Sequence, residues 1–197
     1  MARWAAGSTL TVVSDLFDPG VLEDATIELR RWDNGDVDAV RAARRVDEES
    51  ALVWIQRQQN RSLSVGVSRA IALIGSPAVG YAGLIRRPRL EMGAAGGSED
   101  TDLVFTAHRR VAGIGYWVAP DAQGQGLATR AVALLSRWAL TSAGMIRIEA
   151  LLDPENTASQ RVVEKSGFRP EGRLRAYLAL EGRPTDAPVY SLLTSDL

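Results

Sequence analysis

The sequence predicts a single α+β domain, built on a mixed, mostly antiparallel sheet with helices on both faces. Two observations predict this fold class. The hydrophobic patterns run in the order strand, two helices, three strands, helix, strand, helix and two strands. The 197 residues are enough for one substantial core, and no internal repeat divides them. We therefore place one domain at residues 25–197, preceded by an irregular N-terminal arm at residues 1–24.

The domain opens with a strand and two helices. Residues 26–32 alternate apolar and polar side chains, which is typical of a half-buried strand. Residues 33–36 read Asp-Asn-Gly-Asp and supply turn and N-cap chemistry for a first helix. A second helix is expected from about residue 47 to residue 59.

A hairpin and an insertion follow the two helices. Residues 64–74 and 78–86 both favour β-structure, and the Gly-Ser-Pro sequence at 75–77 favours a turn between them. The segment at about 87–108 is rich in Gly and polar residues, which cannot bury enough apolar surface to order it. We expect a flexible insertion there, between two strands of one core.

The second half of the chain begins with an apolar, aromatic-rich run from Arg110 to Ala119, which predicts a strand. This run breaks at Pro120 and crosses a Gly-rich turn. A helical pattern then starts near Leu127 and ends at Gly144. The expected arrangement is therefore strand, loop and helix.

The remaining elements are a strand, a short helix and two strands. Residues 146–152 alternate in the manner of a strand, and a short helix is expected at about 156–167. An extended segment starts at 167–170 and continues over 173–180, and a predicted turn at 181–184 leads to a last strand at 187–193.

The composition excludes several kinds of chemistry. The 23 basic and 24 acidic residues nearly balance, so we expect neither a nucleic acid nor a membrane as partner. The chain has no Cys, which excludes disulfides, thiolate zinc sites and a cysteine nucleophile. Its one histidine, His108, cannot form a multi-histidine site, and we expect no metal. Since no signal-peptide pattern and no bilayer-spanning apolar run is present, we expect a cytoplasmic protein.

The Gly-rich turn indicates an anion site. Gly124 and Gly126 let backbone N–H groups approach a ligand closely, and the helix that begins near Leu127 adds the partial positive charge of its N-terminus. Such a place suits a phosphate or pyrophosphate. The alternative is that the two glycines only make a tight turn.

Four segments carry a family resemblance. Residues 123–128, Gln-Gly-Gln-Gly-Leu-Ala, resemble the Gln/Arg-x-x-Gly-x-Gly/Ala coenzyme A loop of the GCN5-related N-acetyltransferases (GNAT family). Residues 115–118, 153–159 and 164–168 further resemble the RimJ/RimL-like branch of ribosomal-protein alanine N-acetyltransferases. The resemblance implies a GNAT-like sheet with a splayed strand pair and an acetyl-CoA-dependent N-acetyltransferase. Dimerisation is common in that branch, so a homodimer is a further expectation.

The resemblance also assigns site residues. The loop would bind the pyrophosphate, the end of the preceding strand would pair its main chain with the pantetheine, and the thioester would lie near Tyr116. A backbone N–H close to Val118 would stabilise the oxyanion. The implied cofactor-binding residues are Trp117, Val118, Ala119, Gln123, Gly124, Gln125, Gly126, Leu127, Ala128, Thr129, Asn156 and Ser159, and the implied catalytic residues are Ser159, Asn156 and Tyr116.

Two of these residues also have a plain structural interpretation. In the family, the residue equivalent to Asn156 binds the pantetheine arm, and the serine equivalent to Ser159 helps the thiolate leave. Without the resemblance, Asn156 is an ordinary N-cap and Ser159 a solvated serine of the first turn.

The general base is not assigned. Many relatives carry an acid on the strand before the coenzyme A loop, whereas residues 109–114 here contain none. Glu149, Glu91 and a water chain remain alternatives. An α-amino group with a pKa of ~8 needs less help from a base than a lysine side chain near 10.4. The acceptor is therefore expected to be a protein N-terminal amine or a small-molecule amine, attacking the thioester directly.

Two other functions compete with this hypothesis. A dinucleotide-binding oxidoreductase would need a third glycine where Thr129 stands, and an acid about twenty residues further on at a strand end. The sequence has neither, which argues against this function. A non-catalytic acyl-CoA-binding sensor or partner subunit would bind acetyl-CoA and release no coenzyme A with any amine.

Overall fold

The computed structural model describes residues 18–60, 66–86, 110–180 and 182–197. The predicted insertion at 87–108 lies outside the described residues, together with His108, Glu91 and most of the predicted N-terminal arm. Within the described ranges, no helix is long and apolar enough to cross a membrane.

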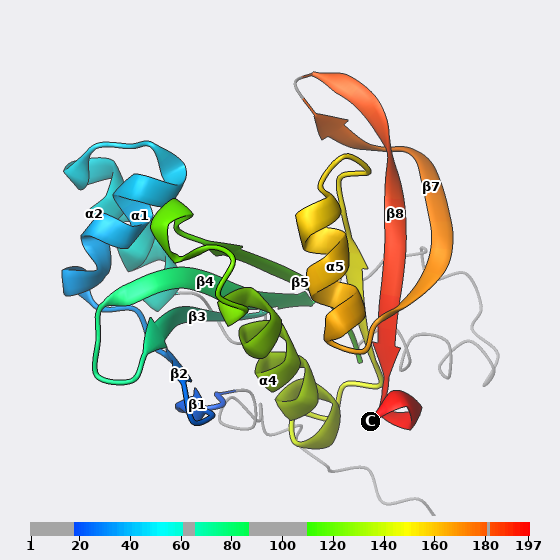
Figure 1. The fold of residues 1–197 in the computed structure, drawn as a ribbon, viewed down its shortest axis with the longest axis horizontal. Coiled ribbons are helices and arrows are strands. Elements are labelled where there is room, and N and C mark those ends of the chain that lie inside the picture. Colours follow the sequence, from blue (N-terminus) through cyan, green and yellow to red (C-terminus); the bar gives the residue numbers. More distant parts are fainter. Residues whose placement is uncertain (1–17, 61–65, 87–109, 181) are drawn as a thin grey trace, which may run out of the picture.

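Eight strands of the described chain form one sheet, in the order β1-β2-β3-β4-β5-β6-β8-β7 (Figure 1). Every neighbouring pair is antiparallel except β5 and β6, which run parallel. The predicted mixed, mostly antiparallel sheet is thus confirmed. The strands are β1 Leu22–Glu23, β2 Ile27–Arg30, β3 Gly66–Leu73, β4 Ala78–Arg86, β5 Val111–Val118, β6 Arg147–Leu151, β7 Arg169–Leu180 and β8 Arg183–Leu193.

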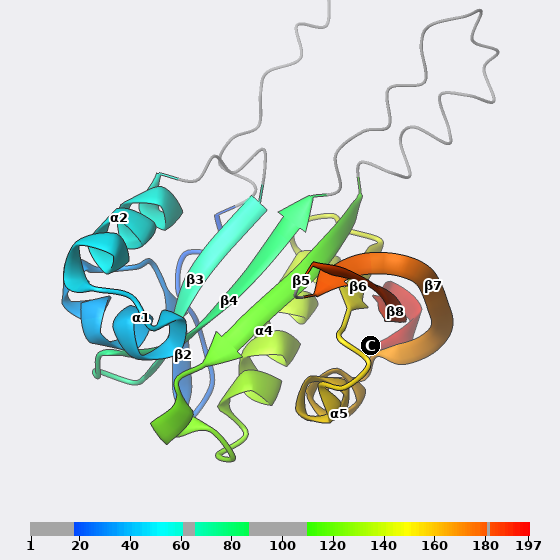
Figure 2. The same cartoon turned by 90° about the horizontal axis from the view of Figure 1, so that it is seen from above.

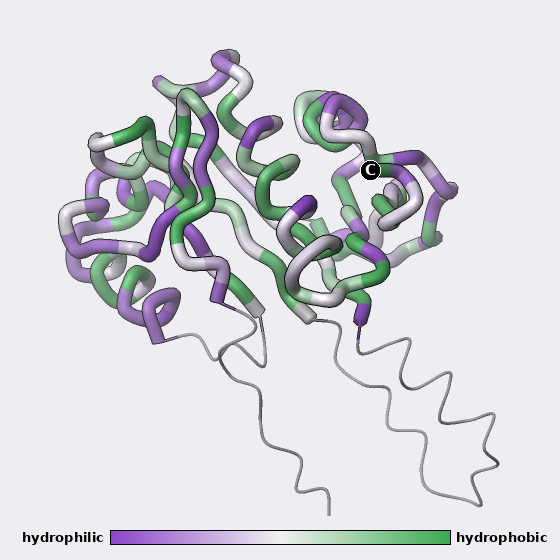
Figure 3. Tube along the Cα trace, turned by 90° about the horizontal axis from the view of Figure 1, so that it is seen from below, coloured by the Kyte–Doolittle hydropathy of each residue, from purple (hydrophilic) through white to green (hydrophobic). Residues whose placement is uncertain are grey.

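Helices cover both faces of this sheet, as the sequence predicts. Helices α1 (Val37–Arg44) and α2 (Glu48–Gln59) lie on one face, while α4 (Leu127–Thr141) and α5 (Thr157–Lys165) lie on the other (Figure 2). The main core fills the space between the central strands and α4. A second cluster of buried residues packs under α1 and α2. Hydrophobic residues accordingly gather along the central strands and α4 (Figure 3).

The last hairpin departs from the prediction at one boundary. A turn was expected over residues 181–184 with the final strand starting at 187, whereas β8 already begins at Arg183. Gly182 has a φ of 75°, in the left-handed region that glycine adopts without strain, so the chain reverses early and the pairing resumes at once. The ladder joins Leu180 to Arg183 and Ala179 to Pro184.

The parallel pair β5–β6 parts after three residues. The register joins residues 111, 112 and 113 to residues 147, 148 and 149, and no further pair of these strands follows. Strand β5 nevertheless continues to Val118 along β4, where Gly80 is the partner of Val118. One edge of β5 is therefore without a neighbouring strand from residue 114 onward, which is the splayed pair expected from the resemblance.

Candidate functional site

The splayed edge of β5 leads directly into the Gly-rich loop. A short 3-10 helix, Pro120–Ala122, comes first and is followed by Gly124 with φ 76° and Gly126 with φ 77°. A Cβ added at either glycine would meet nothing within 4 Å. Glycine is therefore required there by the left-handed backbone rather than by crowding, and the space in front of the loop is open.

Helix α4 begins at this loop without a side-chain cap. Gly126 is its N-cap, and the first turn contains no acidic residue. The first intrahelical bond runs from the Arg130 N–H to the Gly126 carbonyl, at 3.1 Å. The N–H groups of Leu127, Ala128 and Thr129 consequently have no partner within the helix, and they point toward its exposed end. Together with the helix dipole, they suit a phosphate group.

The two glutamines of the loop brace it. The Gln123 side chain donates to the Val118 carbonyl at 3.1 Å, and the Gln125 side chain donates to the Asp121 carbonyl at 3.4 Å. The two carboxamides thus tie the loop to the end of β5 and to the 3-10 helix, so the loop can present its backbone N–H groups in a fixed arrangement. Sequence alone gave no signal for these two contacts.

The main chain at the end of β5 divides between two edges. The Ala119 N–H donates to Val79 on β4 at 2.8 Å, and the Ala119 carbonyl accepts from Ala122 at 2.9 Å. Because the direction of backbone groups alternates along an antiparallel strand, Trp117 faces β4 as Ala119 does. Tyr116 and Val118 face the open edge. Trp117, Val118 and Ala119 are expected to meet pantetheine. Of these three, Val118 has its N–H directed to the open edge, and the N–H of Tyr116 is directed there too.

The side chain of Trp117 lies in an aromatic cluster on the face covered by α1 and α2. Its ring stacks on Tyr81, with centroids 6.3 Å apart and planes 21° apart. Trp54 meets Tyr81 edge-on at 5.9 Å, and Trp32 lies 6.2 Å from Trp117. The cluster was not foreseen, because its members come from α2, β4, β5 and the segment after β2, which only the fold brings together.

Three predicted catalytic residues lie together across the splay. The Tyr116 hydroxyl donates to the Ser159 carbonyl at 3.0 Å, joining β5 to the first turn of α5. The Asn156 side-chain oxygen accepts from the Ser159 N–H at 2.9 Å, so Asn156 is the N-cap of α5. The cap uses the oxygen of this carboxamide and not its NH₂ group. Burial raises the pKa of Tyr116 despite the opposing effect of its bond to Ser159, so the hydroxyl keeps its proton at neutral pH.

A tyrosine also holds the far end of α5. Tyr190 of β8 is buried, and its hydroxyl donates to the Glu164 carboxylate at 3.2 Å. The helix is thus fixed at both ends by tyrosine hydroxyls, one from each side of the splay. Only the bond from Tyr116 is placed where coenzyme A is expected.

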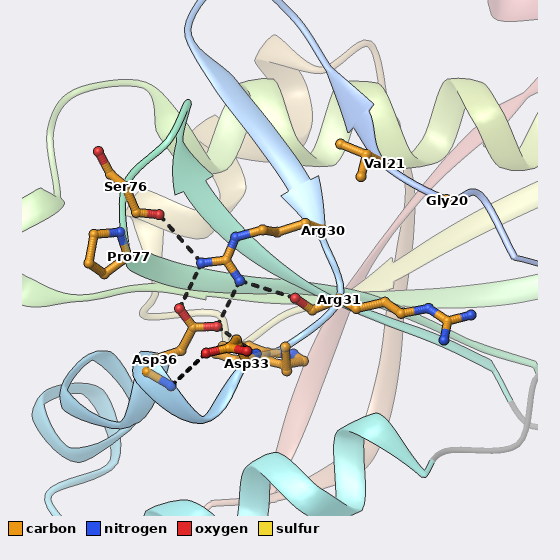
Figure 4. Close-up of a pocket in the computed structure, with 10 residues that line it drawn as sticks. Gly20, Val21, Arg30, Arg31, Asp33, Asp36, Ser76 and Pro77 are labelled. Carbon is orange, nitrogen blue, oxygen red and sulfur yellow. Dashed lines mark hydrogen bonds and ion pairs between the residues drawn. The ribbon is translucent and has the colours of Figure 1, made fainter.

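A cavity of about 680 Å³ lies elsewhere, beside the end of β2, the residues before α1 and the β3–β4 turn (Figure 4). At its centre Arg30 donates to both oxygens of Asp36, at 2.7 and 2.8 Å, and Asp36 also accepts from the Asp33 and Ala78 N–H groups. Burial alone would raise the pKa of Asp36, but these hydrogen bonds hold it below its ordinary value. The pair links β2, α1 and β4, which is a structural role.

Comparison with known proteins identifies the family to which the chain belongs. The model of the acetyltransferase (GNAT) domain matches residues 22–169, so the chain belongs to the GNAT acetyltransferase family. It is therefore an acetyltransferase that uses acetyl-CoA.

Individual relatives extend this result. The uncharacterized N-acetyltransferase YoaA of Bacillus subtilis is 28% identical over 174 residues, which cover 88% of this chain and 96% of that protein. Spermidine N(1)-acetyltransferase of Escherichia coli is 32% identical over 70 residues, 36% of this chain and 38% of that protein. Mycobacterium smegmatis RimJ in complex with CoA-disulfide has a TM-score of 0.65 and 26% identity, and the match covers 90% of this chain and 88% of that one.

The fold itself has further counterparts. A RimL structure with coenzyme A, described as a ribosomal L7/L12 alpha-N-protein acetyltransferase, has a TM-score of 0.66 at 18% identity, covering 90% of this chain and 99% of that one. At this identity the likeness concerns the fold. Structural neighbours thus include RimJ and RimL acetyltransferases, while the curated relative that matches most of the chain has no assigned substrate.

Proposed function

We propose that the chain transfers an acetyl group from acetyl-CoA to a primary amine, either a protein N-terminal amine or a small-molecule amine, by direct attack in a ternary complex. The proposal rests on one observation: the unpaired strand edge of β5 leads through the Gly-rich loop to the uncapped N-terminus of α4. The unpaired edge of β5 ends at Val118, and the uncapped N-terminus of α4 begins at Gly126. A ligand with amides at one end and a pyrophosphate at the other fits this sequence of groups.

Each part of acetyl-CoA has a place in this proposal. The N–H groups of the segment 124–129 hold the pyrophosphate, and the open edge at Tyr116 and Val118 pairs with the pantetheine amides. One of the two N–H groups at this edge stabilises the oxyanion as the thioester carbonyl is attacked. Asn156 and Ser159 approach from α5, where the carboxamide NH₂ can bind the arm and the serine hydroxyl can assist the departing thiolate.

The chemistry of the strand favours an amine of low pKa. On β5, Ala112 and Ile114 are buried and apolar, so this strand offers no carboxylate beside the thioester. An α-amino group with a pKa of ~8 is about one-tenth neutral at pH 7, whereas a lysine side chain near 10.4 is almost entirely charged. The resemblance of the sequence motifs to the RimJ/RimL-like branch, together with the match to RimJ over 90% of this chain, also supports a protein N-terminal amine. A homodimer and the domain boundary at residue 24 stay predictions from the sequence.

A thiol-release assay tests this function. The purified protein is incubated with acetyl-CoA and with peptides that start with Ala, Ser or Met, with polyamines and with aminoglycosides. Steady release of coenzyme A with one class of amine is expected. Failure to bind acetyl-CoA would overturn the proposal, and binding without release for every amine would favour the sensor hypothesis.

A further inference from the structure

A second cavity, of about 90 Å³, lies at the end of β3 that β2 does not reach. The pairing of β2 with β3 ends at Arg30 and Ala70, so residues 66–69 have no partner in β2. The segment before β1 reaches this end of β3, where the Gly20 carbonyl accepts from the Arg69 Nε at 3.2 Å. The described residues that line the cavity include none from β5, the Gly-rich loop, α4 or α5, so it is separate from the proposed acetyl-CoA site.

The charges in the wall of this cavity do not balance. The side chain of Arg69 is buried, with 5% of its surface exposed, whereas that of Arg31 is 76% exposed. Both guanidinium groups form an ion pair with one carboxylate, that of Asp18. The Arg31 side chain extends away from the Arg30–Asp36 pair, as Figure 4 shows. Among the described residues of the wall, Arg31, Arg69 and Asp18 carry the only charges, which leaves one positive charge in excess.

The surroundings of Arg69 disfavour its charge. Burial lowers the pKa of Arg69, the charge of Asp18 acts against this effect, and the charge of Arg31 adds to it. Burial also opposes the charge on Asp18, but hydrogen bonds from Arg31 and from the Gly20 N–H hold its pKa below the ordinary value, so Asp18 is ionised at neutral pH. A further negative charge in the cavity would offset the repulsion between the two guanidinium groups.

The wall also contains hydrogen-bond donors that the described residues do not satisfy. A guanidinium has five N–H groups. The Arg69 Nε donates to the Gly20 carbonyl, and the two terminal nitrogens donate to the Ser68 carbonyl and to Asp18. These bonds leave one N–H on each terminal nitrogen. The Ser68 hydroxyl accepts from the Trp32 indole N–H at 3.2 Å, and its own proton has no acceptor among the described residues.

Donors without acceptors beside an excess of positive charge suit an anion. We propose that this cavity binds a small carboxylate of up to about four heavy atoms, such as formate or acetate, through Arg69 and Ser68. A volume of 90 Å³ is about the share of three water molecules in the liquid, so a larger acid does not fit. The two remaining terminal N–H groups of Arg69 suit the two oxygens of a carboxylate, and the Ser68 hydroxyl adds a third donor. The bound anion neutralises the wall.

Water is the alternative occupant of such a space. A water molecule accepts hydrogen bonds too, but it carries no charge and brings two donors of its own into a wall that is already rich in donors. Gln59 braces this wall, because its NH₂ group donates to the Trp32 carbonyl at 3.0 Å. Trp32 and Ser68 are 4% and 6% exposed, so packing holds both side chains in place. An anion therefore satisfies the wall better than water does.

The test uses the whole protein without acetyl-CoA, so its outcome does not depend on the proposed function. Sodium formate is titrated into ¹⁵N-labelled protein in place of an equal concentration of sodium gluconate, a carboxylate too large for the cavity. The readout is the indole N–H resonance of Trp32, because this group bonds to the Ser68 hydroxyl. The Trp32→Phe variant identifies the signal among those of the five tryptophans.

The indole resonance of Trp32 should shift and saturate with a dissociation constant of about 1–10 mM, since a ligand of so few heavy atoms seldom binds more tightly than about 1 mM. Acetate should act in the same way. Exchange of about 100 mM gluconate for formate should raise the melting temperature by about 3 °C or more, because the anion binds only the folded chain.

Two variants change the wall in opposite directions. Asp18→Asn removes its one carboxylate and should bind formate about tenfold more tightly, because two guanidinium groups then face the anion. Ser68→Ala should bind formate about fivefold more weakly, as measured by the formate-dependent shift in melting temperature.

Asp24→Asn is the matched control for Asp18→Asn. The side chain of Asp24 is 25% exposed against 20% for Asp18, and each pairs with an arginine and accepts from the N–H two residues further on. Because Asp24 does not line the cavity, Asp24→Asn should bind formate as the wild type does.

Three results would overturn the proposal. The first is a Trp32 resonance that stays fixed, or that shifts alike in formate and gluconate, as expected of a cavity filled by water. The second is an Asp18→Asn variant that binds formate no more tightly than Asp24→Asn does. The third is a Ser68→Ala variant that binds formate as tightly as the wild type. If Asp18→Asn does not fold, the wild-type titration and Ser68→Ala decide the question.

Discussion

Two helices of this protein begin in opposite ways. Helix α2 starts at Asp47, whose carboxylate accepts from the Ser50 N–H at 2.7 Å, and its first turn adds two more acids, Glu48 and Glu49. Helix α4 starts at Gly126 with no side-chain cap and no acid in its first turn. The chain closes one helix end with its own negative charge and leaves the other open beside a free strand edge. An open helix end of this kind suits an external anion, which is what the proposed acetyl-CoA site requires.

The largest expected effect on acetyl-CoA affinity comes from closing the open end artificially. Ala128→Asp places a carboxylate in the first turn of α4, where an acid normally stabilises a helix. The protein should therefore melt no lower than the wild type. A carboxylate about 6 Å from a phosphate charge is unfavourable by roughly 3 kcal/mol at an effective dielectric near 20, so affinity should fall about 100-fold in titration calorimetry.

The neutral variant Ala128→Asn is the control for this substitution. It has nearly the same shape and should retain most of the affinity. Equal affinities of the Asp and Asn variants would show that charge at this helix end does not matter, and the comparison between α2 and α4 would then carry no functional meaning.

A smaller effect is expected from Gly126→Ala. Gly144, at the other end of α4, is its matched control because it has φ 69° against 77°, and a Cβ at either position meets nothing within 4 Å. Both alanine variants should lose about 1–2 kcal/mol of stability through the left-handed backbone. Only Gly126→Ala should also lose affinity, about tenfold, since its methyl group stands where the phosphate approaches. Parallel losses of affinity in both variants would contradict the assignment.

The hydrogen bond from Tyr116 to Ser159 across the splay is expected to contribute less to acetyl-CoA binding. Tyr116→Phe removes the hydroxyl that holds the first turn of α5, and Tyr190→Phe removes the one that holds its far end. Each change should reduce the free energy of unfolding by about 1 kcal/mol. Tyr116→Phe alone should raise the KM for acetyl-CoA, by about three- to fivefold, an effect on the order of 1 kcal/mol or less. Identical kinetics of the two variants would limit Tyr116 to a structural role.

Changes at the capped N-terminus of α2 are expected to leave the acetyl-CoA affinity unaffected. Asp47→Ala removes the cap of α2 and should lower the melting temperature while the acetyl-CoA affinity stays unchanged. Hydrogen bonds from Ser50 lower the pKa of Asp47 from 3.8, so its stabilisation is present above that value and is lost as the pH falls through the folded-state pKa. The melting temperatures of variant and wild type should therefore converge in acid. A constant difference down to pH 2 would contradict this account of the cap.

Much of this arrangement could be predicted from local sequence. The Gly-x-Gly loop between a strand and a helix, and the Asn156 cap three residues before Ser159, depend on short-range geometry that residue types determine. The splay of β5 and β6 came from the family resemblance and was confirmed.

Other features depend on register, which sequence patterns alone leave open. Which of Trp117, Val118 and Ala119 faces the open edge follows from the pairing of β5 with β4. The bond from Tyr116 to a backbone carbonyl has no sequence signature. The position of Glu149 beside Gly113 likewise becomes visible only once the two strands are aligned.

The central claim is that acetyl-CoA lies along the open edge of β5 and the open end of α4. The most direct measurement follows the backbone amide resonances of ¹⁵N-labelled protein during titration with acetyl-CoA. The largest shifts should fall on the amides of residues 124–129 and of Tyr116 and Val118, while the amides of residues 47–50 stay unchanged. Largest shifts at the start of α2, or around the Arg30–Asp36 cavity, would contradict the account.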